Sequence, residues 1–282
     1  MQTSTASKTL RVGHSPDPDD AFMFYALSKG AVRLPGYEID HVIEDIQSLN
    51  MRAMRSELDV TAISAAVYPK VARNYWILAS GASVGRNYGP MIVAEKKFSL
   101  HELRGKRIAI PGFQTTAYLL LKIILDDFTS VETSFENIIG AVKSGQVDAG
   151  LIIHEGQLNY KDFGLECCLD LGKFWYDRYK LPIPLGLDVV RKDLGIVTAR
   201  AIQKALKESI IFARTNESQA LDYALEYGRG IPKDTAKIFC GMYVNGDTED
   251  LGVEGERALA LLFKEGAQKG LFEAPEKLEI IR

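Results

Sequence analysis

Short apolar runs alternate with amphipathic stretches over the first two-thirds of the chain. Runs such as 9–13, 37–44, 58–64 and 90–95 have the length and composition of strands, and the stretches between them repeat their apolar positions with a helical period. Such alternation favours a parallel sheet covered by helices on both faces. From about Thr198 the pattern becomes helical with no further convincing strand, and we expect this helical tail to pack back onto the N-terminal part of the fold.

The alternating pattern runs twice, which predicts two α/β lobes. Residues 1–97 and 187–282 form a large discontinuous lobe in this interpretation, and residues 98–186 form a smaller one. The chain crosses outward near 97–103 and returns near 182–186, and no linker rich in Pro, Gly or Ser separates the halves. Two crossings are typical of hinged solute-binding folds, in which the ligand lies in the cleft between the lobes.

Composition narrows the class of partner. The chain has 282 residues, of which 46% are hydrophobic and 25% are charged, and its net charge is -3 with no basic run interleaved with aromatic residues. Nucleic acid is therefore not expected as a partner. No apolar run approaches the roughly 20 residues of a membrane helix, and the polar N-terminus lacks the pattern of a signal peptide. We expect a cytoplasmic protein that binds a small molecule, and the sequence leaves the oligomeric state open.

Several common catalytic and cofactor motifs are missing from the sequence. It has no G-x-G-x-x-G after a strand, no G-x-x-x-x-G-K-[ST], no G-x-S-x-G and no H-E-x-x-H. The four histidines lack metal-ligand spacing, and the three cysteines fit neither a disulfide framework nor a C-x-x-C pair. We therefore expect no metal site and no bound nucleotide cofactor.

His154 stands out from the other histidines. It ends the apolar run AGLIIH and would project from the carboxyl end of a buried strand, which is where open α/β sheets bind their ligands. A general base and a purely structural histidine are both open readings of this position. Glu155 follows it and either orients the imidazole or serves a helix cap or hinge.

Two further stretches carry polar groups that a ligand can use. Gly112 precedes Thr115 and Thr116 at the start of a predicted helix, whose N–H groups and hydroxyls could bind an anion or simply cap the helix. The loop SPDPDD contains Asp17, Asp19 and Asp20, for which capping and turn chemistry is an adequate explanation, although paired acids for acid–base work are an alternative.

These segments together resemble those of the 1,4-dihydroxy-6-naphthoate synthase family of the futalosine pathway to menaquinone. The likeness covers nearly the whole chain. The segments that carry it are SPDPDDAFMFYAL, EDIQSLN, GRNYGPMIVA, PGFQTTAYLLL, VDAGLIIHEG, LPIPLG and GERALALLF.

The resemblance implies a two-lobed α/β fold like that of type II periplasmic binding proteins, used as an enzyme without a metal or organic cofactor. The implied reaction converts cyclic dehypoxanthine futalosine to 1,4-dihydroxy-6-naphthoate, a carbon–carbon cleavage of the lyase type. The family's catalytic base falls on His154. Its substrate contacts fall on Thr115, Thr116, Ala62, Ile63 and Ser64.

The chain departs from the family pattern in two places. Asp17, Asp19 and Ala21 replace a Cys, an Asn and a Thr that are frequent in the first loop, and Ala62 stands where members can carry Lys. Polar contacts from these positions are in question. Two alternatives also stay open at this level: a non-catalytic solute-binding protein of the same fold, and chorismate dehydratase.

Overall fold

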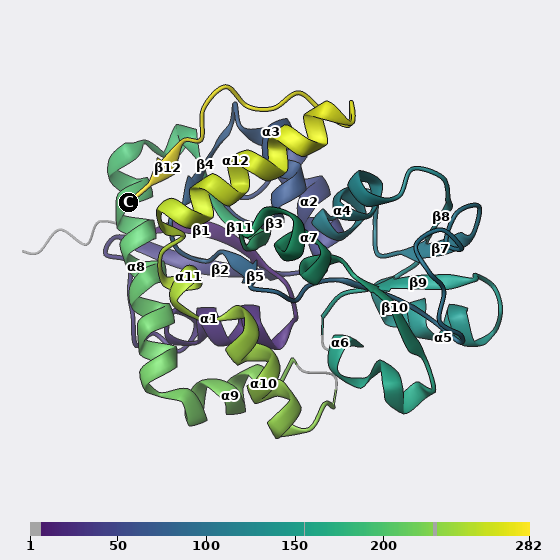
Figure 1. The fold of residues 1–282 in the computed structure, drawn as a ribbon. Coiled ribbons are helices and arrows are strands. Elements are labelled where there is room, and N and C mark those ends of the chain that lie inside the picture. The colour runs from purple at the N-terminus through teal and green to yellow at the C-terminus, as the bar shows by residue number, and fades with distance from the viewer. Residues whose placement is uncertain (1–6, 155, 228–229) are drawn as a thin grey trace, which may run out of the picture.

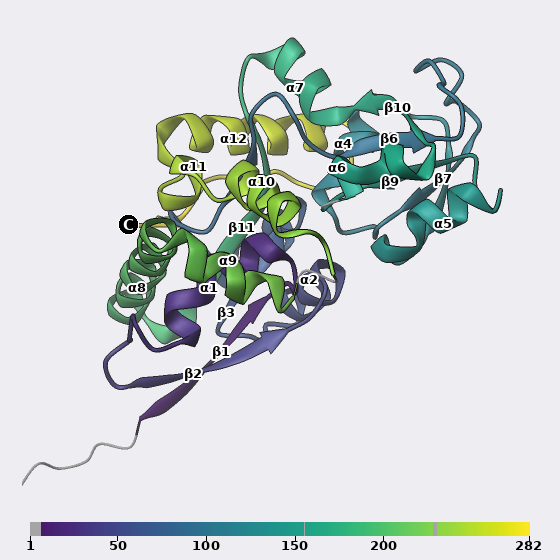
Figure 2. The same cartoon turned by 90° about the horizontal axis from the view of Figure 1, so that it is seen from below.

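A computed structural model describes residues 7–154, 156–227 and 230–282 of the chain. The described residues form two lobes, each built around its own β-sheet. Figures 1 and 2 show the lobes side by side, the first carrying α8, α9, α10 and α12 and the second carrying α5 and α6. The two-lobed α/β fold expected from the alternating pattern is confirmed.

The sheet of the first lobe is mixed rather than parallel. Its order is β12-β4-β11-β3-β1-β2, and β5 pairs with β11. β1 runs parallel to β2 and β3, whereas β11 runs antiparallel to β3, β4 and β5. The strands are β1 (Lys8–His14), β2 (Tyr37–Ile43), β3 (Val60–Ser64), β4 (Tyr75–Leu78), β5 (Ser83–Gly85), β11 (Ile183–Arg191) and β12 (Ile280–Ile281).

The expectation of a parallel sheet holds for β1, β2 and β3 but not for β11, and the reason is topological. The chain comes back from the second lobe along β11, which enters the first sheet in the opposite direction to β3. The expectation of no strand after Thr198 was also wrong, because Ile280 and Ile281 pair in parallel with β4.

The helical tail covers the first lobe, as expected. Helix α1 packs against α8, α9 and α10, and α12 packs against β11. Phe22 and Phe24 of α1 share one buried cluster with Leu206 and Ile210 of α8. The helices of this lobe are α1 (Pro18–Ser28), α2 (Ile46–Met54), α3 (Tyr68–Val71), α8 (Ile196–Thr215), α9 (Glu217–Leu225), α10 (Lys233–Tyr243), α11 (Gly246–Glu249) and α12 (Gly252–Gln268).

The second lobe holds a smaller sheet with the order β10-β6-β9-β7-β8. β7 runs parallel to β8 and β9, and β6 runs antiparallel to β9 and β10. Its strands are β6 (Met91–Ala94), β7 (Arg107–Ile110), β8 (Thr129–Glu132), β9 (Ala149–Ile152) and β10 (Glu166–Asp170). Its helices are α4 (Thr116–Ile124), α5 (Ile138–Lys143), α6 (Gly156–Asn159) and α7 (Leu171–Tyr179).

These pairings differ from the expected division at both crossings. Strand β6 lies within residues 1–97 but pairs in the second sheet, and β11 begins inside 98–186 but pairs in the first. The segment that joins β5 to β6 touches the first turn of α7 closely. A side chain at Gly172 would place its Cβ 2.1 Å from the carbonyl group of Tyr88, so only glycine fits this contact.

One apolar cluster connects the two lobes. It includes Ile77 and Val189 of the first sheet, Ile108 of the second, Leu120 of α4 and Trp175 of α7, all almost fully buried. The lobes are therefore packed together along one side of the cleft rather than tethered by two strands alone. No helix in the described ranges is long and apolar enough to cross a membrane.

Candidate active site

A cavity lies between the lobes and contains all six residues expected to form the site. β3 supplies Ala62, Ile63 and Ser64 from the first lobe, whereas Thr115, Thr116 and His154 come from the second. The remaining lining residues include Asp17, Asp19, Asp20, Gln157, Leu185, Leu187, Phe239 and Tyr243. Sequence reasoning thus brought together side chains that lie on opposite faces of the cleft.

His154 lies two residues after the end of β9 and contacts the first lobe. Its Nδ1 lies 2.8 Å from Oδ2 of Asp17, and the side chains of the two residues are only 12% and 6% exposed. The ring of Phe135 meets the imidazole edge to face, with the centroids 4.5 Å apart. A carboxylate at Nδ1 favours the tautomer that carries its proton there and makes Nε2 the basic nitrogen.

The backbone of His154 has an unusual conformation. Its φ is +61°, in the left-handed region that is uncommon for residues other than glycine. A backbone hydrogen bond from the amide of Gln157 to the carbonyl of His154, 3.2 Å long, closes the turn at the start of α6. Such conformations cost about 1–3 kcal/mol and persist where surrounding contacts fix them. Glu155, which the sequence left as an orienting or capping residue, lies outside the described residues.

Asp17 belongs to a group of buried carboxyl groups that interact electrostatically with one another. Burial and the nearby Asp17 raise the pKa of Asp20 to about 6, and burial together with Asp20 and Asp17 raises the pKa of Asp19 well above its usual range. Asp188 on β11 is 1% exposed, and burial together with Asp20 raises its pKa too. Burial is the main cause of the raised pKa values of Asp19, Asp20 and Asp188, and repulsion between neighbouring carboxylates adds to it.

Thr115 and Thr116 begin α4 as expected, but both hydroxyls already have protein partners. Thr115 Oγ1 caps the helix by accepting from the amide of Tyr118 at 3.2 Å and donates to the carbonyl of Gly112 at 2.9 Å. Thr116 Oγ1 donates to the carbonyl of Leu185 at 2.7 Å and accepts from the amide of Ala66 at 3.1 Å. The donors left for an anion at this helix end are therefore first-turn N–H groups.

Asn50 of α2 positions the stretch that ends β3. Its Nδ2 donates to Ser64 Oγ at 3.0 Å, and its Oδ1 accepts from the amide of Ser64 at 2.8 Å. Asn50 is fully buried, so this pair fixes the Ser64 backbone and leaves the serine hydroxyl hydrogen able to point elsewhere. The asparagine of EDIQSLN was the sequence signal for this residue, although spacing alone gave it no role.

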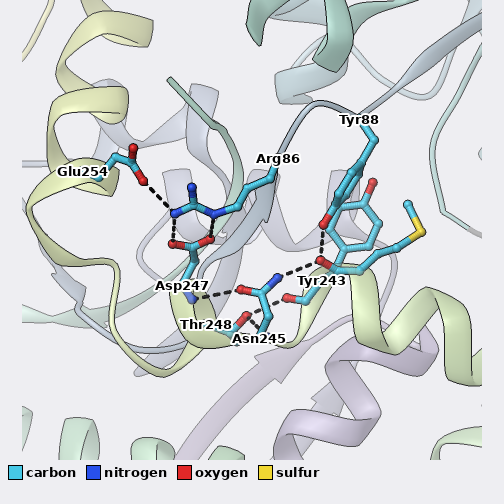
Figure 3. Close-up of polar contacts among 8 residues, drawn as sticks. Arg86, Tyr88, Tyr243, Asn245, Asp247, Thr248 and Glu254 are labelled. Atoms are coloured by element: carbon cyan, nitrogen blue, oxygen red, sulfur yellow. Dashed lines mark hydrogen bonds and ion pairs between the residues drawn. The ribbon is translucent and has the colours of Figure 1, made fainter. Parts of the chain in front are cut away.

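Helix α10 contributes Phe239 and Tyr243 to the wall of the cavity. Tyr243, at its last turn, donates a hydrogen bond from its hydroxyl to Gln157 Oε1 of the second lobe, 3.1 Å away. Figure 3 shows how the adjoining chain is fixed: Tyr88 donates to the carbonyl of Met242, and Arg86 makes a two-point ion pair with Asp247 at 2.6 and 2.7 Å. These contacts fasten the segment that joins β5 to β6 to the end of α10 and to the chain that follows it.

Comparison with known proteins shows which family this chain belongs to. A family described as "Menaquinone biosynthesis" matches residues 10–268. The chain belongs to that family. A 1,4-dihydroxy-6-naphthoate synthase of Thermus thermophilus is 40% identical over 264 residues, which cover 94% of this chain and 96% of the relative. One from Streptomyces coelicolor is 35% identical over 276 residues, covering 95% and 96%.

Solved structures show which fold this chain shares. A crystal structure of a protein from Archaeoglobus fulgidus is 47% identical, with a TM-score of 0.91 over 96% of this chain and all of that one. The alkanesulfonate-binding protein SsuA of Xanthomonas axonopodis pv. citri has a TM-score of 0.74 at 15% identity, covering 98% and 97%. A Candida albicans protein described as having the periplasmic binding protein fold scores 0.70 at 12% identity, covering 97% of each chain. The chain therefore has the periplasmic-binding-protein fold.

Within this family fold, sequence reasoning missed the partner of His154. Asp17 occupies the N-cap position of α1, yet its side chain makes no capping hydrogen bond to that helix. Its Oδ2 instead accepts from Ser15 Oγ at 2.8 Å and meets the imidazole. Capping and turn chemistry, the explanation favoured from sequence for this loop, is therefore incomplete for Asp17.

Proposed function

We propose that this chain is a 1,4-dihydroxy-6-naphthoate synthase that converts cyclic dehypoxanthine futalosine to 1,4-dihydroxy-6-naphthoate. Two synthases with 40% and 35% identity over nearly the whole length support this function. The observation that carries the mechanism is the buried contact between His154 and Asp17 in the cavity between the lobes. A cytoplasmic location stays a prediction.

His154 is the general base in this proposal. The reaction separates the sugar-derived ring from the nascent aromatic system, a carbon–carbon cleavage that begins with removal of a proton. An imidazole of ordinary pKa about 6.5 accepts a proton near neutral pH. Aromatisation of the product supplies driving force, so the proposed reaction uses no metal or organic cofactor. Among the described residues, no group of three or more His, Cys, Asp or Glu side chains is placed to hold a metal ion.

The substrate carboxylate docks at the start of α4 in this proposal. The N–H groups of Thr116 and Ala117 lie in the first helical turn, where they lack partners within the helix and where the helix dipole favours an anion. The hydroxyl of Ser64 reaches the same cavity from the first lobe. Thr115, Ala62 and Ile63 then shape the site through packing and backbone position rather than through free hydroxyl donors.

Incubation of the purified protein with cyclic dehypoxanthine futalosine, followed by mass detection of the naphthoate, tests the activity. His154→Asn should lower turnover by on the order of 10² to 10⁴, the usual effect of losing a general base. His101→Asn, the same change at an exposed histidine, is the matched control and should keep full turnover. Near-normal turnover of His154→Asn would show that another group is the base.

The same assay separates the two alternatives. A non-catalytic binding protein would retain the futalosine derivative without forming product, and chorismate dehydratase would consume chorismate instead. Incubating the protein with each substrate in turn assigns one outcome to each function.

A further inference from the structure

We propose that Asp17 is a positioning residue that reaches across the cleft to orient His154 and to stabilise its protonated form. This inference rests on the proposed function, because it deepens the role of the same base. The two residues belong to different lobes: Asp17 lies in the loop between β1 and α1, and His154 follows β9. The catalytic imidazole of the second lobe is thus completed by a carboxylate of the first.

The loop holds Asp17 in a fixed position. Ser15 Oγ donates to Asp17 Oδ2 at 2.8 Å, and the amide of Ser15 donates to Asp20 Oδ2 at 2.7 Å. The same Asp17 oxygen faces His154 Nδ1 at 2.8 Å, a distance typical of a charge-assisted hydrogen bond. A carboxylate fixed in this way selects one imidazole tautomer and one ring orientation.

The negative charge of the loop before α1 explains how Asp17 can stabilise the protonated form of His154 as well as orient its ring. Asp17, Asp19 and Asp20 are all buried, and a buried carboxylate is costly unless it is paired. When His154 accepts a proton, the imidazolium becomes the counter-charge for Asp17. The pair is therefore more favourable after proton transfer than before it, which is the property that accelerates a proton abstraction.

The backbone around His154 aims the ring at the first lobe. The left-handed φ of +61° turns the chain between β9 and α6, and α6 in turn contacts α10 through Gln157 and Tyr243. The contact of His154 with Asp17 and that of Gln157 with Tyr243 therefore join the lobes within one short turn. The orientation of His154 therefore depends on the first lobe being in place against it.

The decisive experiment combines Asp17→Asn with His154→Asn in a double-mutant cycle. Asp17→Asn keeps the shape and removes the charge, and we expect kcat to fall on the order of 10-fold to 10³-fold with KM changed less than about threefold. If Asp17 acts through His154, the double variant should be no slower than His154→Asn alone. Asp170→Asn, the same change at the N-cap of α7, is the control and should keep the wild-type kcat.

A nitrogen NMR spectrum of the histidines gives a readout that needs no substrate. His154→Asn identifies the signal, and the wild-type protein should show the proton on Nδ1. Asp17→Ala should spread that proton over both nitrogens while the thermal unfolding curve confirms that the variant is folded.

An unchanged tautomer in Asp17→Ala, a wild-type kcat in Asp17→Asn, or a double variant slower by the product of the single effects would overturn the inference. A wild-type protein that forms no naphthoate would instead refute the proposed function and leave the NMR result to decide the contact.

Discussion

Thr115 and Thr116 are adjacent, yet their hydroxyls do different work. Thr116 Oγ1 bridges the amide of Ala66 and the carbonyl of Leu185, both in the first lobe, whereas Thr115 Oγ1 caps its own helix. Thr116→Val leaves a buried N–H and a buried carbonyl without their partner, a cost of about 1–3 kcal/mol for each group. Thr115→Val loses a cap worth about 1 kcal/mol. In chemical unfolding, we expect the Thr116 variant to lose more stability.

Binding of a product analogue to the same two variants tests how the anion docks. Both hydroxyl hydrogens are donated to backbone carbonyls, so we expect each variant to keep its affinity within about threefold. Calorimetric titration measures this. A loss of 10-fold or more in Thr115→Val at unchanged stability would show that the hydroxyl, rather than the helix N–H groups, binds the carboxylate.

Residues of the site were predictable from sequence where a strand end or a helix start marked them. His154 and Ser64 each close an apolar run, and Thr116 opens a helix. Asp17 was not predictable as the partner of His154, because an aspartate two residues after a serine and before a proline explains itself as a turn residue. Only the packing of one lobe against the other reveals its second role.

At the scale of elements, the contact between α10 and α6 closes the cavity. Tyr243→Phe keeps the ring that lines the wall and removes the hydroxyl that donates to Gln157 across the cleft. A typical hydrogen bond contributes about 0.5–1.5 kcal/mol, so the affinity for a product analogue should fall roughly 2-fold to 12-fold. Tyr223→Phe, which alters the contact with Tyr227 within the first lobe, is the control and should bind normally. Equal affinities of the wild type, Tyr243→Phe and Tyr223→Phe for the analogue would show that the hydroxyl of Tyr243 does not contribute to closing the cavity.

Strand β11 shows why some elements escaped the sequence pattern. Its first half reads IPLG, and proline is normally excluded from central strands because it lacks the N–H of the ladder. The structure accommodates Pro184 at a register shift between β11 and β5, where the ladder is interrupted. A local pattern cannot show that irregularity, since the partner strand lies far away in the sequence.

At the scale of the whole molecule, we expect the two lobes to close over the cavity by rotating about one axis. The apolar cluster of Ile77, Val189, Ile108 and Trp175 holds the lobes together on one side, so opening must be a rotation about that side. We expect the free protein to sample a wider cleft and a saturating product analogue to close it, which would lower the radius of gyration in X-ray scattering. Profiles that coincide with and without the analogue would count against this motion.

The two-lobed plan itself was predictable, because alternating strands and helices repeat on both sides of one crossing. The exact boundaries were less accessible to sequence reasoning. β6 follows the first-lobe strands without a break in pattern, and only its ladder with β9 assigns it to the second sheet. Sheet membership is a long-range property, whereas periodicity is a local one.

The position of β11 in the sheet also has a consequence for folding during synthesis on the ribosome. This strand lies between β3 and β4 and pairs with both, but the entire second lobe precedes it in the chain. A ribosome delivers the N-terminal segments first, so the growing chain exposes the open edges of β3 and β4 until residues 183–191 emerge. The smaller lobe has all its strands by then and can fold ahead of the larger one. Unpaired edges are the places where nascent chains stick to one another, and translation speed through the second lobe sets how long that hazard lasts.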